Sequence, residues 1–313
     1  MQTTLRSAID FKGVGLHSGR PVRLRIEPAP EDHGLRFVRS DLDHLEIPAL
    51  WDRVEDARLC TRIFSDSVAG AQVSTIEHVM AALAGCGVQN ARLVIDAPEV
   101  PILDGSSAPF VEAIRRVGLV RQNRPLRALA IRQAVEVQMG EARARLEPAE
   151  RFEIRFEIDF ADPAIGHQRK RLDMANGAFV RELMDCRTFC RAADIDAMRA
   201  RGLALGGTYE NAVVVDGEKV LSPGGLRHRD EAVRHKMLDA MGDLALAGGP
   251  ILGRYTGIRA GHALTNALLR KLFDTPGAAE WVTLDAVAAG ALPGAGVCAL
   301  HAAGRGAARA SAA

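Results

Sequence analysis

Hydrophobic and polar residues alternate in several short stretches of the first 125 residues, as expected where one face of a β-strand is buried. Such stretches predict strands over residues 21–30, 35–39 and 90–97. Residues 74–87 instead repeat apolar side chains at helical spacing and end in glycines, which predicts a helix. A second helix is predicted to begin near Pro109, because proline is favoured in the first helical turn.

The polar segment 121–127 contains a proline and has no periodicity, which predicts a linker. Beyond it strands and helices begin again, with the clearest alternation at 151–160. Further strands are predicted over residues 126–140, 141–148, 213–221, 251–258 and 280–284. Further helices are predicted over residues 176–185, 193–201, 230–248 and 262–273.

Strands with helices packed on them, twice over, predict the α+β fold class with two layered domains, residues 1–122 and 127–285. The length of 313 residues agrees with two domains of about 150 residues each. From residue 286 onward the chain is rich in alanine and glycine, lacks periodicity and carries few charges. Residues 286–313 are therefore predicted to be a mostly disordered tail.

The charge balance excludes several classes of protein. Forty Lys and Arg face 39 Asp and Glu, which is too even for a protein that coats nucleic acid. No stretch approaches the roughly 20 apolar residues of a membrane span. The first residues do not resemble a signal peptide, and the five cysteines are odd in number and irregularly spaced. We therefore expect a cytoplasmic protein with reduced thiols.

The strongest candidate for chemistry lies on the predicted helix at 230–248. His235, Asp239 and Asp243 are spaced four residues apart, so they project from one helix face. An imidazole and a carboxylate one turn apart can both bind a divalent metal. A solvated polar face is the alternative interpretation, and the spacing by itself leaves both open.

Glu77 and His78 lie in the predicted helix at 74–87. His78 can supply a third metal ligand, and Glu77 can act as a general base beside it. The spacing of Ser74 and Glu77 is also that of a capping box, in which the glutamate bonds back to the amide of the serine. On periodicity alone, helix capping is the better explanation.

Two further segments carry polar groups without a periodic context. His262 follows Gly261 at the start of a predicted helix, as a residue facing a cleft would, although an ordinary boundary histidine is the alternative. Residues 186–190 contain two cysteines but no others nearby, so a cysteine-bound zinc or iron–sulfur site is not expected. Thr188 and Phe189 between them supply a hydroxyl donor and an exposed aromatic ring.

Taken together, these segments resemble the zinc-dependent UDP-3-O-acyl-N-acetylglucosamine deacetylase family of lipid A biosynthesis. The motifs occur in the family's order and approximate spacing, over roughly residues 2–285: GVGLHSG, STIEHVMAAL, PEVPILDGSSAPF, RTF, RGLALGG, LRHRDEAVRHKMLDAMGDL and GHALTN. The family implies two domains of similar architecture, each a sheet packed against a helix layer, with the active site between them. It also favours chemical roles for Glu77, His78 and His262.

The resemblance implies one Zn²⁺ per chain, with a coordination position left for water, and three ligands: His78, His235 and Asp239. Glu77 matches the family's general base, which takes the proton of the water that attacks the 2-acetamido carbonyl. Thr188 and protonated His262 are implied to stabilise the oxyanion. Asp243 is implied to orient His262 and to keep it cationic.

The implied substrate is a UDP-linked acylated amino sugar. Lys236 and Arg259 match family positions near the nucleotide, and Phe160 matches an aromatic residue that stacks on uracil. The remaining implied substrate contacts are Cys60 and, along the passage for the 3-O-acyl chain, Phe189, Ile195 and Val214. Ordinary core packing is the alternative for the apolar positions.

The expected activity is zinc-dependent hydrolysis of the acetamido group, which releases acetate and a free amine. The family suggests a monomer, and we expect neither a nucleic-acid partner nor stable membrane insertion. One alternative is a non-catalytic UDP-sugar-binding module that has kept the fold and binds no stoichiometric zinc. Another is a zinc amidase of different specificity, although the HExxH motif of peptidases is absent.

Overall fold

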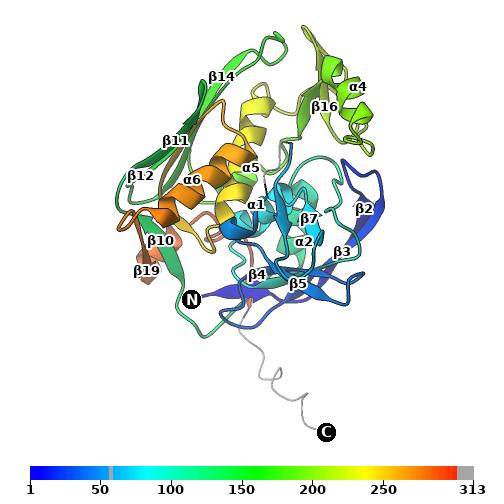
Figure 1. Ribbon diagram of the computed structural model, residues 1–313. Helices are drawn as coiled ribbons and strands as arrows, with labels where there is room; N and C mark the ends of the chain where they lie inside the picture. Colours follow the sequence, from blue (N-terminus) through cyan, green and yellow to red (C-terminus); the bar gives the residue numbers. More distant parts are fainter. Residues whose placement is uncertain (56–58, 302–313) are drawn as a thin grey trace.

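The computed structural model describes residues 1–55 and 59–301. The chain forms two halves with a large sheet each, and two central helices lie between them (Figure 1). The helices are α1 (Glu77–Cys86), α2 (Ala108–Val117), α3 (Ala178–Glu182), α4 (Ala192–Ala200), α5 (Glu231–Ala245), α6 (His262–Asp274) and α7 (Ala286–Gly290), with a 3₁₀ turn at Trp51–Arg53. The predicted α+β class is confirmed.

The first half contains a five-stranded sheet. Its strands, in spatial order, are β2 (Ile9–Val14), β3 (Pro21–Pro28), β8 (Ala91–Ile95), β4 (Leu35–Arg39) and β5 (Leu45–Pro48). Val22, Leu24 and Ile26 of β3 are buried while the arginines between them are exposed, as the sequence predicted. A short hairpin of β6 (Arg62–Phe64) and β7 (Gln72–Ser74) leads toward α1.

The second half contains a seven-stranded sheet. Five of its strands lie in this spatial order: β11 (Val135–Met139), β12 (Ala142–Glu147), β18 (Ile251–Ile258), β10 (Arg127–Ile131) and β19 (Ala279–Thr283). Strand β13 (Phe152–Asp159) also pairs with β18, and β14 (His167–Asp173) pairs with β13. Strand β14 was not predicted from the sequence. Its residues alternate only between exposed and half-buried positions, so they show no apolar alternation.

The two central helices, α1 and α5, pack against each other between the halves (Figure 1). Nearly every residue of α1 is buried, and α5 is buried along most of its length. A helix that is covered on all sides needs apolar residues around its whole circumference. The histidine, aspartate and glutamate side chains on these two helices are therefore exceptions that require a polar partner or a ligand.

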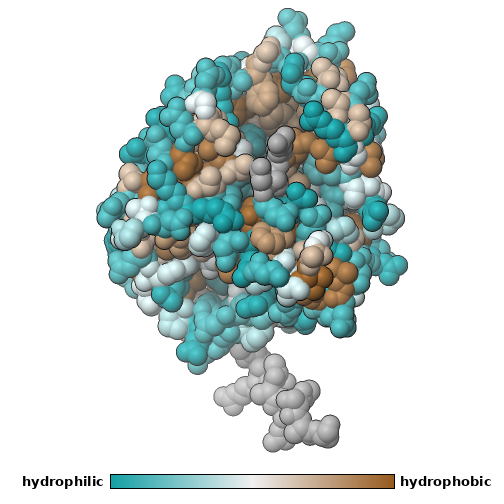
Figure 2. Space-filling model, viewed as in Figure 1, coloured by the Kyte–Doolittle hydropathy of each residue, from teal (hydrophilic) through white to brown (hydrophobic). Residues whose placement is uncertain are grey.

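A smaller unit projects from the second half, at the upper right of Figure 1. It consists of α4 and a three-stranded sheet of β15 (Phe189–Arg191), β16 (Val213–Asp216) and β17 (Lys219–Val220). Figure 2 shows apolar residues in the recess between this unit and the hairpin of β13 and β14. None of the helices in the described part of the chain is long and apolar enough to cross a membrane.

The prediction of a disordered tail is wrong for residues 286–301. These residues form α7 and a short strand, β20 (Leu300–His301), which pairs in parallel with β9 (Leu119–Arg121) beside β1 (Thr3–Leu5). A Cβ on Gly294 would lie 2.2 Å from the amide nitrogen of Gly87, so the two backbones are in direct contact. Such backbone contacts leave no periodic signal in the sequence. Residues 302–313 lie outside the described residues.

Candidate active site

The start of α1 presents Glu77 and His78. Strand β7 ends at Ser74, Thr75 turns the chain with a positive φ of 57°, and Glu77 is the first residue of the helix. The predicted capping box is therefore wrong. The hydroxyl of Ser74 donates to the carbonyl oxygen of Pro98 (3.1 Å), and the carboxylate of Glu77 accepts from the amide of Thr61 (3.0 Å).

Helix α5 approaches this turn closely because residue 242 is a glycine. A Cβ on Gly242 would lie 2.0 Å from the carbonyl oxygen of Glu77. No side chain fits there, so glycine allows the two backbones to meet. This contact brings Asp239 and Asp243, one turn apart on α5, beside the first residues of α1.

His78, His235 and Asp239 form one buried group whose ligand atoms lie within 4.8 Å of one another. Oδ1 of Asp239 is 3.2 Å from Nε2 of His235 and 3.7 Å from Nε2 of His78. Nδ1 of His235 donates to the carbonyl oxygen of Cys186 (3.0 Å). This bond fixes the tautomer of His235 and leaves the lone pair of its Nε2 directed toward Asp239.

The chemistry of this group fits a divalent metal. Oδ1 of Asp239 is buried and has no hydrogen-bond partner among the described residues, which is rare for a carboxylate oxygen. Burial lowers the pKa of His78 to about 3, so its imidazole is neutral, as a metal ligand must be. Burial favours the neutral carboxyl of Asp239, but His235 and Lys236 override it and hold its pKa well below the usual range. Two imidazoles and a carboxylate are a ligand set typical of zinc.

Glu77, His262 and Asp243 form a second group beside the first. Nδ1 of His262 donates to Oδ2 of Asp243 (2.9 Å), and Nε2 of His262 lies 4.0 Å from Oε1 of Glu77. All three side chains are less than 10 % exposed. Asp243 therefore orients the imidazole so that its free edge faces Glu77.

The electrostatics of this second group separate an acid from a base. Burial raises the pKa of Glu77 to about 7, against the attraction of His262. Burial acts to lower the pKa of His262, but the carboxylates of Asp243 and Glu77 override it and raise the pKa to about 9. At neutral pH His262 is a cation beside a carboxyl group that titrates near that pH, which is suited to proton transfer.

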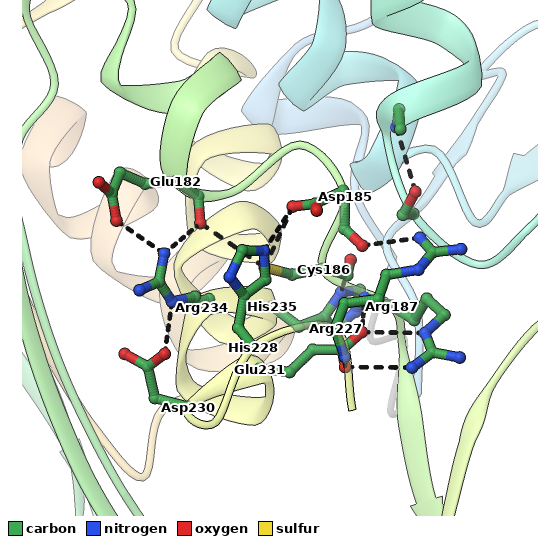
Figure 3. Close-up of polar contacts among 12 residues, drawn as sticks. Glu182, Asp185, Cys186, Arg187, Arg227, His228, Asp230, Glu231, Arg234 and His235 are labelled. Atoms are coloured by element: carbon green, nitrogen blue, oxygen red, sulfur yellow. Dashed lines mark hydrogen bonds and ion pairs between the residues drawn. The ribbon is translucent and has the colours of Figure 1, made fainter. Parts of the chain in front are cut away.

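The segment that carries Thr188 and Phe189 is anchored to the first turn of α5. Glu231 accepts hydrogen bonds from the main chain and guanidinium of Arg187 and from the amide of Arg227 (Figure 3). The ring of Phe189 packs edge-to-face on His235 with a centroid distance of 6.2 Å. The hydroxyl of Thr188 has no hydrogen bond within the residues that the structure describes, so it is available to a ligand.

Two of the three predicted nucleotide contacts lie near the metal group. Lys236 donates to Oδ2 of Asp239 (2.8 Å), and its side chain is 17 % exposed. Phe160 packs edge-to-face on Phe189 with a centroid distance of 5.4 Å. Arg259 instead forms ion pairs with Asp159 (2.5 Å) and Glu141, so its contact with a pyrophosphate would require these pairs to be exchanged.

The remaining predicted contacts divide between two places. Cys60 directly precedes Thr61 near Glu77, and burial raises the pKa of its thiol to about 12, with Glu77 adding to the effect. Ile195 on α4 and buried Val214 on β16 belong to the small unit at the edge of the recess. Cys190 of β15 is paired with Val214, one residue after Phe189. The roles of these residues in binding remain predictions.

No sequence pattern singled out Thr61, which contacts both Glu77 and Asp243. It did single out the glycine-rich motif around His17, without assigning it a role. The amide of His17 donates to Glu99 (2.7 Å), and a buried Nε2 on its ring has no hydrogen-bond partner among the described residues. The contact of Thr61 with Asp243 and that of His17 with Glu99 each join residues that are distant in the chain.

A second group of possible metal ligands has a less suitable environment. The ligand atoms of this group lie within 4.8 Å of one another and belong to Asp185, Cys186 and His228. Burial raises the pKa of the Cys186 thiol, with Asp185 adding to the effect, so the thiolate that binds metals is disfavoured. Nε2 of His228 is already paired with Asp185 (2.8 Å), and Arg227 lies against the same loop (Figure 3).

Comparison with known proteins agrees with this geometry. Residues 2–274 match the family described as UDP-3-O-acyl N-acetylglycosamine deacetylase. A UDP-3-O-acyl-N-acetylglucosamine deacetylase of Anaeromyxobacter sp. (strain Fw109-5) is 47% identical over 283 residues, 90% of this chain and 92% of the relative. Proteins of the same name from Xanthomonas oryzae pv. oryzae (strain PXO99A) and Shewanella sp. (strain W3-18-1) are 46% and 45% identical, covering 90% and 91% of this chain and 93% of each relative.

Proposed function

The chain belongs to the UDP-3-O-acyl N-acetylglycosamine deacetylase family, and on this basis we propose that it removes the acetyl group from UDP-3-O-acyl-N-acetylglucosamine. The reaction is hydrolysis of the 2-acetamido bond, which releases acetate and a free amine in lipid A biosynthesis. The observation that carries the proposal is the group of His78, His235 and Asp239 directly beside Glu77 and His262.

We propose that one Zn²⁺ per chain is held by His78, His235 and Asp239. When bound, a zinc ion supplies Lewis-acid polarisation of a carbonyl oxygen and makes a water molecule more acidic. The unpartnered Oδ1 of Asp239 and the neutral imidazole of His78 support this assignment. Lys236 occupies Oδ2 of Asp239, which leaves Oδ1 for the ion.

Glu77 is proposed as the general base. Its Oε2 is held by the amide of Thr61, so Oε1 faces His262 and the site. A pKa of about 7 allows the carboxylate to accept a proton from the attacking water at neutral pH and to release it again.

His262 is proposed to remain protonated while the oxygen of the acetamido group gains negative charge. The pKa of about 9 keeps it cationic at neutral pH, and Asp243 holds it through Nδ1 so that Nε2–H is directed into the site. A cation fixed in a buried site stabilises a developing oxyanion strongly. The same Nε2–H can supply the proton that the departing amine requires, and the unbonded Thr188 hydroxyl is proposed as a further donor to the oxyanion.

The substrate is proposed to lie across the recess between the α4 unit and the hairpin of β13 and β14. Phe160 and Phe189 would flank it near the metal group, and Lys236 would contribute positive charge toward the pyrophosphate. The acyl chain is proposed to lie along the small unit, next to Ile195 and Val214. Cys60 and Arg259 are proposed to contact the substrate farther from the metal group.

The enzyme is proposed to act as a monomer. All five cysteines lie within the described residues and are free thiols, which supports a reaction in the reducing cytoplasm. The test is to incubate the purified, zinc-loaded protein with UDP-3-O-acyl-N-acetylglucosamine and to measure acetate. Stoichiometric acetate release is expected, and its absence would contradict the proposed function.

A further inference from the structure

Thr61 lies at the centre of the acid–base group, although it is neither a metal ligand nor an acid or base. Its side chain is 2 % exposed, and it directly precedes β6. Its carbonyl oxygen accepts a hydrogen bond from the amide of Ile76 (3.3 Å), the residue before Glu77. The backbone of Thr61 is therefore fixed relative to the start of α1.

Thr61 donates hydrogen bonds to two carboxylates that come from different halves of the molecule. Its amide donates to Oε2 of Glu77 (3.0 Å), and its hydroxyl donates to Oδ1 of Asp243. The amide bond engages Oε2 of Glu77 and leaves Oε1 at 4.0 Å from Nε2 of His262. Nδ1 of His262 lies closest to Oδ2 of Asp243 (2.9 Å) and is 3.2 Å from Oδ1, the oxygen that also accepts from Thr61. Three hydrogen-bonded contacts and the 4.0 Å contact between His262 and Glu77 thus form a closed ring of four residues: Thr61, Glu77, His262 and Asp243.

We propose that Thr61 is a positioning residue for the reaction assigned above. Its hydroxyl fixes the rotation of the Asp243 carboxylate and thereby the orientation of the His262 imidazole, while its amide fixes Glu77. This inference rests on the proposed function. The physical reason is that the terminal torsion of an aspartate is broad, so a carboxylate with a single partner rotates more freely than one held by two donors.

The hydroxyl is tested with two substitutions that differ mainly in that group. Thr61→Val keeps the shape and the amide of the residue but removes the hydroxyl, whereas Thr61→Ser keeps the hydroxyl. Because hydrogen-bond partners of metal-site and catalytic groups typically contribute about 10–100-fold, we expect Thr61→Val to lower kcat by that factor. KM and zinc per chain should stay at the wild-type values, and Thr61→Ser should restore most of kcat.

A matched control separates positioning from simple loss of a buried hydrogen bond. Thr4 is also buried, and its hydroxyl donates to the carbonyl oxygen of Asn90 (2.7 Å) in the first half of the chain. Thr4→Val should lower the thermal midpoint without changing kcat per bound zinc. A merely structural role for Thr61 predicts the same behaviour in Thr61→Val.

A double variant, Thr61→Val with Asp243→Asn, tests whether the Thr61 hydroxyl affects kcat through Asp243. If the hydroxyl acts through Asp243, the double variant should have nearly the kcat of Asp243→Asn alone. Full additivity of the two losses would overturn the proposal, and so would a wild-type kcat in folded, zinc-loaded Thr61→Val. If the valine variant does not fold, Thr61→Cys, whose thiol is a weak donor, is judged by the same criteria.

Failure of this inference is distinguishable from failure of the proposed function. A wild-type protein that releases no acetate would contradict the function itself. Acetate release by the wild type together with an unchanged Thr61→Val would reject only the positioning role.

Discussion

Gly242 of α5 rests directly on the carbonyl oxygen of Glu77, at a distance that excludes any side chain. We expect Gly242→Ala to push the two helices apart, because the added Cβ would lie 2.0 Å from that backbone oxygen. The stability loss should be about 1–3 kcal/mol, as for overpacked cores, and zinc affinity should fall with it. Thermal unfolding and zinc titration measure both. Gly290→Ala is the control, since nothing lies within 4 Å of its Cβ position; equal behaviour of the two variants would show that the helix contact is unimportant.

Glu77→Gln should retain the fold and the zinc but lose activity. The amide side chain can still accept from Thr61, but it cannot accept a proton from water. Loss of a general base typically lowers kcat by about 10²–10⁴-fold. Acetate release and elemental zinc are measured on the same sample, with exposed Glu112→Gln as the reference. An active Glu77→Gln would remove Glu77 from the role of base.

Asp243→Asn should change the pH dependence of kcat. The pKa of His262 is raised to about 9 by carboxylates that outweigh burial, so its cationic form is present below that pH and is lost as the pH rises through it. Without the charge of Asp243 this loss should occur at lower pH. Rates measured between about pH 6 and about pH 10 would show an alkaline limb displaced toward neutrality.

The control for this profile is Glu157→Gln, which alters a carboxylate paired with the exposed His167 (2.9 Å). Its profile should match that of the wild type. An alkaline limb that does not move in Asp243→Asn would mean that His262 does not govern it.

Removal of the metal should abolish acetate release, and addition of Zn²⁺ should restore it. Zinc that binds only the folded state should also raise the thermal midpoint. Asp239→Asn should bind less zinc and be less stable, because it replaces a ligand and leaves Lys236 without its anionic partner. Asp10→Asn, at an exposed pair with Arg25, should bind zinc normally. A full zinc content in Asp239→Asn would contradict the ligand assignment.

Deletion of residues 286–313 should weaken the fold but not the chemistry. The segment contacts Gly87 just beyond the C-terminal end of α1, while Glu77 is at the other end, roughly 15 Å away for a ten-residue helix. We expect the thermal midpoint to fall by at least about 2 °C, the shift produced by about 1 kcal/mol in a protein of this size. A chain ending at residue 301 keeps every contact described above and is the reference. A lower kcat per zinc in the shorter chain would link the segment to the site.

The parts of the site that could be predicted from the sequence are those with local spacing. Four-residue spacing placed His235, Asp239 and Asp243 on one helix face, and the structure brings the first two together with His78. Thr61 could not be found in this way, because its hydroxyl meets a carboxylate 182 residues further along the chain. A hydroxyl on a residue that precedes a short strand has no sequence pattern that indicates such a partner.

The errors in the sequence interpretation have equally specific causes. The pattern at Ser74 and Glu77 matches a capping box, but Thr75 adopts a left-handed conformation that ends the strand before the helix begins. Strand β14 was missed because it carries charged residues on both faces. The segment after residue 286 is held by backbone pairing with β9, which its composition does not reveal.

The closed ring of Thr61, Glu77, His262 and Asp243 has a consequence for the order of events during protein synthesis. Glu77 and His78 leave the ribosome early, but Asp239, Asp243 and His262 follow only after more than half of the remaining chain has been made. A nascent chain, or a fragment cut between the halves, has no complete site. A complete site therefore requires that both halves of the chain have been made and have folded against each other.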